Sequence, residues 1–300
     1  MHTMIYEWGT RDDFLLPRLY PEAQVVEAEP LVDDDKILQL TETAVRQYPA
    51  QARQWFFHLN ISLSEHWLSG RETIISALEQ RGYRVFNGRV TDIRKHHLQA
   101  LTQQLGLGHV SVTADEDPHL RVMVKSDYNY GGIGESQLSP RQAQKLGLQC
   151  LDGCSVQTYS DYYLTRLGDV EDHVWDDPRL VVERYIENPD QRFYRFYRCG
   201  SKAVLSELIN HDVVKKMVPG LPRQNWFFDY GKESAHCYQT LIDKATTLCD
   251  HMGLNYGALD MVMDEADQGY IIDVNPTPGW GAEKQGEMLT FLRTGIETQA

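Results

Sequence analysis

The chain has 300 residues, and its 29 Lys and Arg against 43 Asp and Glu give a formal net charge of −14. That length suffices for one large domain or for two to three small ones that share a cleft. An acidic surface repels a phosphate backbone, which argues against a nucleic-acid partner. It does not exclude ATP, because backbone amides and a few local cations can hold a triphosphate inside an acidic molecule.

The sequence predicts a cytoplasmic protein with no membrane segment. It has no apolar run of eighteen or more residues. The opening segment MHTMIYEWGTRDD lacks the basic and apolar parts of a secretory signal. Its five cysteines have no CxxC spacing, so reduced thiols are favoured over a metal site at Cys150 and Cys154.

Hydrophobic patterning in the first third of the chain predicts alternating helices and strands. Helical stripes span 35–48 and 69–81, and apolar, aromatic runs span 54–59 and 83–87. Gly82 is expected to end the second helix. Because strand, helix and strand follow in that order, we expect a small parallel sheet.

The rest of the chain favours antiparallel hairpins. Asp92 is expected to cap a helix that ends at Gly106. A polar segment with three glycines, residues 126–135 and called the glycine loop below, follows a strand. Turns at Gly200 and at 264–269 would each join two strands. The other predicted elements are a helix over 236–252 and strands over 120–125, 180–186, 193–198, 203–209, 258–263 and 270–274.

The last hairpin carries a candidate metal site. Asp273 and Asn275 are two residues apart on a strand, so their side chains face the same side, and pairing around the turn would bring Asp260 beside them. Two carboxylates and an amide oxygen are hard ligands of the kind that Mg²⁺ prefers. A solvent-facing acidic hairpin is the alternative, but the flanking residues are apolar, and buried carboxylates need a partner.

Two further segments suit a nucleotide. Lys125 ends an apolar strand, where its ammonium group could reach a phosphate. Gly131, Gly132 and Gly134 would let backbone amides approach the β- and γ-phosphates. The spacing matches neither the phosphate loop GxxxxGK[ST] nor a dinucleotide fingerprint.

The strand around Glu183 suits the other end of the nucleotide. It continues through Tyr185 to Ile186, and its end could offer backbone groups to an adenine edge. The carboxylate of Asp190 would accept hydrogen bonds from the ribose hydroxyl groups.

Taken in this order, these residues resemble the ATP-grasp superfamily, especially its carboxylate–amine ligases, such as D-alanine–D-alanine ligase and the ligase that adds glutamate to a ribosomal protein. The resemblance covers roughly residues 50–296. The segment from Lys95 to Gly106 is similar to the lysine-bearing helix of that family. Two departures are Arg94, where Asp is usual, and Asp273, where Glu is common.

The resemblance implies roles for most of these side chains. Lys95 and Lys125 would contact phosphates, and Arg195 would steady the transferred phosphate. The segment from Glu183 to Ile186 would be the adenine hinge, and Asp190 would be the ribose acid. Asp260, Asp273 and Asn275 would bind Mg²⁺, with Mn²⁺ as an alternative.

The resemblance also implies an α/β ATP-grasp fold in three parts. These are a small N-terminal α/β domain over 1–90, a central lobe with the glycine loop over 91–186 and a C-terminal lobe with the metal site over 187–300. The γ-phosphate would pass to a carboxylate of a small molecule or peptide, and an amine would attack the acyl phosphate. A kinase acting on a hydroxyl group and a nucleotide-binding protein without turnover stay open, as does a homodimer.

Several residues admit a second interpretation. For His58, His66, His96 and His97, a packed or solvated histidine is favoured over an acid–base role. A solvated lysine pair is slightly favoured for Lys215–Lys216 over contact with a substrate anion. Trp280 suits a core position and an acceptor pocket about equally. The acceptor would be selected by loops around 61–70, 208–226 and 276–285, which the sequence does not decode.

Overall fold

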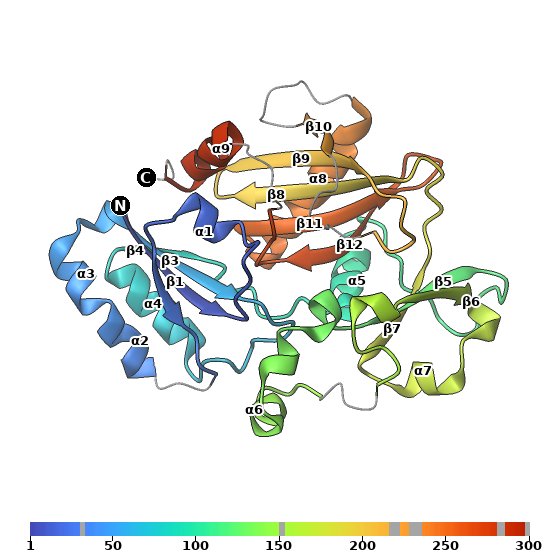
Figure 1. Ribbon diagram of the computed structural model, residues 1–300, viewed down its shortest axis with the longest axis horizontal. Coiled ribbons are helices and arrows are strands. Elements are labelled where there is room, and N and C mark those ends of the chain that lie inside the picture. Colours follow the sequence, from blue (N-terminus) through green and yellow to red (C-terminus); the bar gives the residue numbers. More distant parts are fainter. Residues whose placement is uncertain (31–33, 150–153, 216–222, 228–235, 281–285, 298–300) are drawn as a thin grey trace.

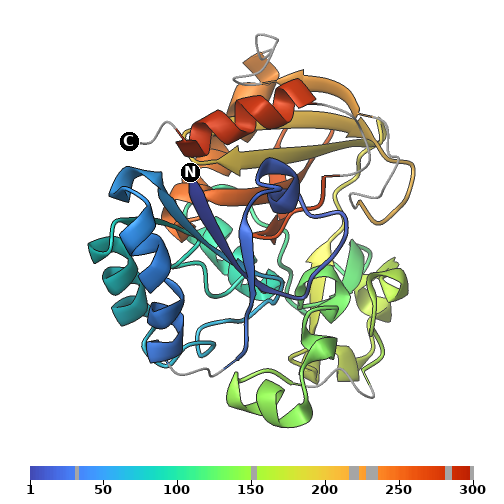
Figure 2. The ribbon, with the colours of Figure 1, turned by 60° about the vertical axis from the view of Figure 1, so that its left-hand side comes forward.

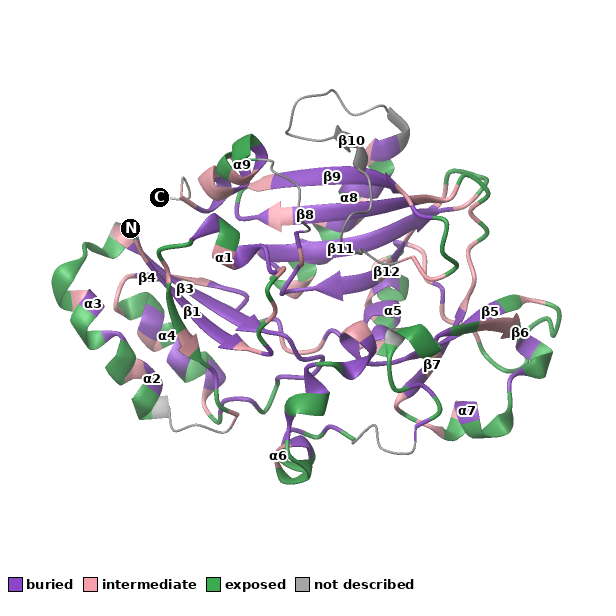
Figure 3. Cartoon of the chain, viewed as in Figure 1, coloured by how far each residue is buried: buried purple, intermediate pink, exposed green. Residues whose placement is uncertain are grey.

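The computed structural model describes residues 1–30, 34–149, 154–215, 223–227, 236–280 and 286–297. Three β-sheets form its frame (Figure 1). Most strand residues are buried, while the helices expose one side to solvent (Figure 3). Cys150 and Lys216 lie outside the described residues. The described cysteines whose side chains are placed, Cys154, Cys199 and Cys249, are buried free thiols.

The N-terminal sheet has four parallel strands, in the order β2 (Gln24–Glu27), β1 (His2–Trp8), β3 (Arg53–Leu59) and β4 (Tyr83–Phe86). The predicted parallel sheet is therefore confirmed, with two strands at its start that the sequence did not indicate. The helices α2 (Asp34–Leu40), α3 (Glu42–Gln47) and α4 (Arg71–Gln80) stack together along this sheet (Figure 2). A short helix, α1 (Leu16–Leu19), lies between this sheet and the C-terminal part of the chain.

The single helix predicted over 35–48 is wrong, because two helices meet at Thr41. The Thr41 hydroxyl donates to the Leu38 carbonyl oxygen at 2.7 Å. The Arg81 guanidinium also donates to that carbonyl oxygen and to Thr41 Oγ1, each at 2.5 Å. These side-chain bonds occupy an acceptor that a continuous helix would use, so the helix is interrupted there.

The middle of the chain forms a three-stranded antiparallel sheet in the order β6 (Tyr163–Arg166), β5 (Arg121–Ser126) and β7 (Leu180–Arg184). The helix α7 (Asp172–Asp176) packs against this sheet, whereas α5 (Lys95–Gln104) packs on the C-terminal sheet and α6 (Pro140–Lys145) joins the core of the N-terminal sheet. Single 3₁₀ turns complete the loops: η1 (Ala50–Ala52), η2 (Asn129–Gly132), η3 (Glu135–Gln137), η4 (Tyr159–Asp161) and η5 (Leu167–Asp169).

The prediction that Asp92 caps α5 is wrong. The N-cap residue is Arg94, two residues later, and its own side chain makes no cap bond. The Asp92 carboxylate instead accepts from the Arg94 amide at 3.0 Å and from the Arg94 guanidinium at 2.6 Å. The charge pair with the neighbouring arginine therefore outcompetes capping.

The C-terminal sheet has five antiparallel strands in the order β10 (Arg223–Phe227), β9 (Lys202–Ile209), β8 (Arg192–Cys199), β11 (Tyr256–Met263) and β12 (Gly269–Asn275). Both predicted hairpins, β8–β9 and β11–β12, are confirmed. The helices α5 and α8 (His236–Met252) pack on one face of this sheet. The helix α9 (Gly286–Glu297) covers part of the other face, together with α1 and the N-terminal sheet (Figure 2).

The glycine loop packs against the end of the N-terminal sheet. The Trp8 indole donates to the Gly134 carbonyl oxygen at 3.2 Å, and the Ser62 amide donates to the Glu135 carboxylate at 2.7 Å. A methyl group at Gly134 would lie only 1.6 Å from the Asn60 carbonyl oxygen. Gly134 has ordinary helical torsions (φ −70°, ψ −41°), so close packing rather than backbone conformation requires glycine there.

We expect Gly134→Ala to destabilise the protein by about 2 kcal/mol, because the overlap with Asn60 forces the loop away from the sheet. Gly286→Ala is the matched control, since a methyl group there would meet none of the described atoms within 4 Å. Chemical denaturation of both variants measures the difference. Equal stability of the two variants would contradict the proposed packing.

Candidate nucleotide site

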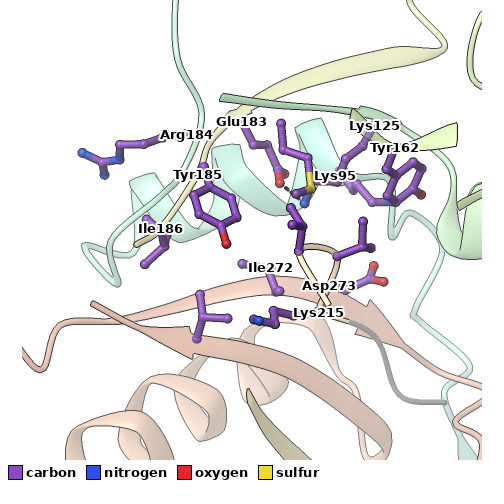
Figure 4. Close-up of a pocket in the computed structure, with 14 residues that line it drawn as sticks. Lys95, Lys125, Tyr162, Glu183, Arg184, Tyr185, Ile186, Lys215, Ile272 and Asp273 are labelled. Atoms are coloured by element: carbon purple, nitrogen blue, oxygen red, sulfur yellow. Dashed lines mark ion pairs between the residues drawn. The ribbon is translucent and has the colours of Figure 1, made fainter. Parts of the chain in front are cut away.

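One pocket of about 580 Å³ lies between the central sheet and the C-terminal sheet (Figure 4). The pocket walls come from β5, β7, α5, the segment after β9, β11 and β12. Its lining comprises Lys95, Met123, Lys125, Tyr162, Glu183, Arg184, Tyr185, Ile186, Val213, Val214, Lys215, Val262, Ile272 and Asp273.

The pocket is cationic although the chain is acidic. Four of its lining side chains are Lys or Arg and two are carboxylates, whereas the whole chain has a formal net charge of −14. Apolar side chains supply most of the remaining wall. Such a mixture suits a ligand with a flat apolar part and an anionic part.

Lys125 and Glu183 form a buried ion pair across β5 and β7. The Lys125 ammonium contacts Glu183 Oε2, with the Glu183 side chain 1% exposed. Met123, not Lys125, is the direct cross-strand partner of Glu183. The Lys125 side chain therefore extends diagonally from β5 to contact Glu183 on β7. The other oxygen, Glu183 Oε1, is buried and accepts no hydrogen bond from the described residues.

Lys95 enters the same pocket from the first turn of α5. Its ammonium group donates to the Tyr128 carbonyl oxygen at 2.7 Å and lies 5.9 Å from the centre of the Tyr162 ring. Only 1% of this residue is exposed. Lys95 and Lys125, 30 residues apart in the sequence, thus meet in one cavity (Figure 4).

The end of β7 leaves one backbone donor unused. The Arg184 amide donates to the Val110 carbonyl oxygen at 2.6 Å, and the Tyr185 amide donates to that of Arg121 at 2.9 Å. The next amide, that of Ile186, has no backbone acceptor among the described residues. A free donor beside apolar walls can bind the edge of a flat heterocycle.

The predicted metal residues lie together on the C-terminal sheet. Asp260 is paired in register with Asp273 on β12 and with Arg195 on β8. The Arg195 guanidinium donates to Asp260 Oδ1 at 2.7 Å, and the Asn275 amide lies 3.5 Å from Asp260 Oδ2. Burial opposes the charge on Arg195, but the Asp260 carboxylate keeps the pKa of Arg195 above its usual value. Arg195 therefore carries a full positive charge beside two carboxylates.

A β-bulge directs Asp273 into the pocket. The register shifts between Asp260 and Met261, which leaves Ile272 without a direct partner on β11. Ile272 and Asp273 both line the pocket, although adjacent residues of a regular strand would face opposite sides. Asp260 and Arg195 lie beside Asp273 on the next two strands, and Asn275 lies two residues further along β12; none of the three lines the pocket.

Some predicted residues lie away from the pocket. Asp190 is 72% exposed and pairs with Arg192 at 3.6 Å. Gly131 and Gly132 have positive φ angles of 70° and 82° and form the turn that leads to the N-terminal sheet. With Gly134, they do not line the pocket in the described part of the chain.

Other lining residues were not predicted from the sequence. Lys215 was favoured as solvated, but it lines the pocket and donates to the Asn210 carbonyl oxygen at 2.7 Å, and burial lowers its pKa. Strand alternation could have indicated Met123, which shares a face with Lys125. No comparable signal identifies Tyr162 or Val214, which reach the pocket from irregular segments.

Two of the residues that admit a second interpretation, His58 and Trp280, lie in the core. His58 is fully buried and pairs with Glu7 at 2.8 Å, and Trp280 is buried against Tyr197 with ring centres 5.0 Å apart.

Among the described residues, no helix is long and apolar enough to span a membrane. Within the same residues, no group of three or more His, Cys, Asp or Glu side chains could hold a metal ion.

Comparisons with known proteins give a likeness of fold. No protein-family model and no curated protein match the chain. Solved structures that match include a D-alanine–D-alanine ligase from Bacillus anthracis, at 11% identity over 99% of this chain and 97% of that one (TM-score 0.47). A D-alanyl-alanine synthetase A from Vibrio cholerae matches at 12% identity over 100% and 99% (TM-score 0.48). A RimK domain ATP-grasp protein from Sphaerobacter thermophilus matches at 11% over 99% and 98% (TM-score 0.47).

The predicted α/β class with a small N-terminal α/β part is confirmed by the chain's own topology. A three-stranded and a five-stranded antiparallel sheet enclose one pocket, beside a small parallel sheet at the N-terminus. At such identities and TM-scores, the solved structures do not define the activity of this chain or its substrates.

A mutational cycle on Lys125 and Glu183 tests the buried ion pair. Lys125→Met should destabilise the protein by about 3 kcal/mol, because it leaves a buried carboxylate without its cation. Adding Glu183→Gln to Lys125→Met should recover most of the lost stability.

The exposed pair Arg121–Glu187, 2.6 Å apart and about half exposed on both sides, is the control on the same two chain segments. Its own cycle should give a coupling of about 0.5 kcal/mol. Denaturant unfolding measures both cycles. A coupling for the buried pair no larger than that of the control would contradict the assignment.

Proposed function

We propose that this protein binds ATP in the pocket between the two antiparallel sheets and uses it to activate a carboxylate for attack by an amine. The observation that carries the proposal is the meeting of Lys95, Lys125 and Asp273 in one partly apolar cavity. Glu183 already balances Lys125, and the second buried cation, Lys95, still favours a bound anion in the same cavity.

The adenine end would lie along β7 and the bulge of β12. Met123, Ile186 and Ile272 provide apolar contacts for a flat ring. Within the described residues, Glu183 Oε1 accepts no hydrogen bond and the Ile186 amide has no backbone acceptor. An adenine offers an amine donor and ring-nitrogen acceptors, which complement that pair.

The phosphate end would lie between the two lysines and the C-terminal sheet. Phosphoryl transfer requires positioning and charge neutralisation, and it needs no side-chain nucleophile. Lys95 and Lys125 supply positive charge at the pocket wall, and Arg195 supplies it from the C-terminal sheet, two strands from Asp273. In this proposal, the lysines hold the phosphates while Arg195 steadies the group in transfer.

The oxygen donors of the C-terminal sheet fit a magnesium ion in their chemistry. Asp273 lines the pocket, with Asp260 and Asn275 adjacent on the same sheet. Three protein oxygens do not complete an octahedral shell, so phosphate oxygens and water would fill it. Asp273 would hold the ion directly, with Asp260 and Asn275 beside it. When bound, Mg²⁺ would neutralise phosphate charge.

The ligase reaction follows from the order of these groups along the chain, which resembles the carboxylate–amine ligases from the lysine helix to the Asp–Asn hairpin. The acid and the amine are small molecules or peptides in this proposal. The alternative to this ligase reaction is a kinase reaction, in which the phosphate stays on a hydroxyl group of the product.

Asp273→Asn tests the metal assignment, because its effect on nucleotide affinity should have opposite signs with and without Mg²⁺. With Mg²⁺ present, the variant should bind a non-hydrolysable ATP analogue about tenfold more weakly, because the ion loses a charged ligand. Without Mg²⁺, it should bind the analogue more tightly than the wild type, because Asp273 then only repels the phosphates. Calorimetric titration measures both affinities.

Asp267→Asn is the control for Asp273→Asn. Asp267 lies in the exposed turn of the same hairpin with a φ of 60°, a conformation that Asn also tolerates. The control should bind like the wild type under both conditions. Weaker binding by Asp273→Asn without Mg²⁺ as well would refute a role through the metal.

The reaction class is tested by the fate of the phosphate. With the correct acid and amine, turnover should produce ADP and free phosphate in equal amounts. Hydroxylamine in place of the amine should trap the acyl phosphate as a hydroxamate, and omission of the acid should abolish it. ADP formation with a stable phosphorylated product and no free phosphate would identify a kinase instead.

A further inference from the structure

Asp127 joins three elements directly behind the pocket. It follows β5 at the start of the glycine loop and is fully buried. Its amide donates to the Arg179 carbonyl oxygen, just before β7, at 2.8 Å. Its own carbonyl oxygen accepts from the Lys95 amide, at the first residue of α5, at 3.0 Å.

His96 compensates the buried carboxylate of Asp127. The His96 amide donates to Asp127 Oδ1 at 2.8 Å, and its ring nitrogen Nδ1 lies 2.5 Å from Asp127 Oδ2. A buried carboxylate is costly unless donors or a cation face it, and an imidazolium is both. The His96 side chain is 53% exposed, so water can exchange its proton.

The same junction positions both pocket lysines. Lys95 directly precedes His96, and its ammonium group donates to the Tyr128 carbonyl oxygen. Lys125 directly precedes the two residues that lead to Tyr128. A shift of α5 relative to the end of β5 would therefore change the spacing of the two ammonium groups.

We propose that His96 is a positioning residue that makes nucleotide affinity depend on pH. Its charged imidazole holds Asp127 and thereby fixes Lys95 and Lys125 at the spacing that binds the phosphates. This inference rests on the proposed function for the role of the lysines.

The charges around His96 set the direction of the effect. The Asp127 hydrogen bond raises the pKa of His96 above its usual 6.5, against burial and the Arg94 guanidinium, with a smaller contribution from Asp92. His96 thus keeps its charge longer in the folded protein than in the unfolded chain. Its contribution is fully present below pH 6.5 and is lost as pH rises through the raised pKa.

His96→Asn is the test variant, because the Asn amide can replace the Nδ1 donor without carrying a titrating charge. His97→Asn makes the same change at the next residue, whose ring nitrogen lies 3.9 Å from Asp92 and which does not contact Asp127. Calorimetry would measure the affinity for a non-hydrolysable ATP analogue with Mg²⁺ between pH 5.5 and 8.5. Because the terminal phosphate also titrates near neutral pH, each variant is compared with the wild type at the same pH.

We expect His96→Asn to bind about tenfold more weakly than the wild type at the acidic end, the usual difference between a charge-assisted and a neutral hydrogen bond. The difference should shrink at the alkaline end, and His97→Asn should follow the wild type throughout. A constant ratio across the pH range, or equal affinities, would overturn the inference.

Thermal unfolding without nucleotide separates the two proposals. The stability difference between the wild type and His96→Asn should also shrink as pH rises, whether or not ATP binds. If the wild type binds no ATP analogue, the proposed function fails, and the positioning role fails with it. If the wild type binds but His96→Asn matches it at every pH, only the inference about His96 fails.

Discussion

The buried ion pair between Lys125 and Glu183 is the interaction on which the pocket depends. It joins the two neighbouring strands that form one wall, and it decides how the charges of the pocket balance. Glu183 neutralises one cation of the wall, while Lys95 and Lys215, which donate to backbone carbonyl oxygens, add positive charge to the same cavity. An acidic chain can therefore keep a local positive field, because desolvated charges act at short range while the surface charge is screened.

The opposite wall depends on strand register. Antiparallel pairing aligns Arg195, Asp260 and Asp273 on three successive strands, so one sheet face carries a cation beside a row of two carboxylates. The bulge at Ile272 then turns an apolar side chain and a carboxylate toward the same cavity. A regular hairpin would have buried one of them against α8, so this irregularity gives the pocket both its apolar floor and its acid.

The sequence predicted these strands better than it predicted their surroundings. Alternation and turn residues identify the β11–β12 hairpin, because its period is local. The edge strand β2 is four residues long and largely exposed, so it has no such period. Packing of Gly134 depends on the Asn60 carbonyl oxygen, 74 residues away, and no local pattern encodes a contact of that kind. The same holds for the pairing of Lys125 with Glu183, which requires knowledge of which strands are neighbours.

The N-terminal residues, for which the sequence matched no known pattern, explain how the glycine loop keeps its shape. Tyr130 has a φ of 49°, a left-handed conformation that is costly for a residue with a side chain. The Arg11 guanidinium lies 4.3 Å from the centre of the Tyr130 ring, and Trp8 bonds to the loop four residues later. These contacts offset the strain from outside the loop. The loop begins at the end of β5, which carries Lys125, so the N-terminal sheet helps to set the geometry of the pocket that it does not line.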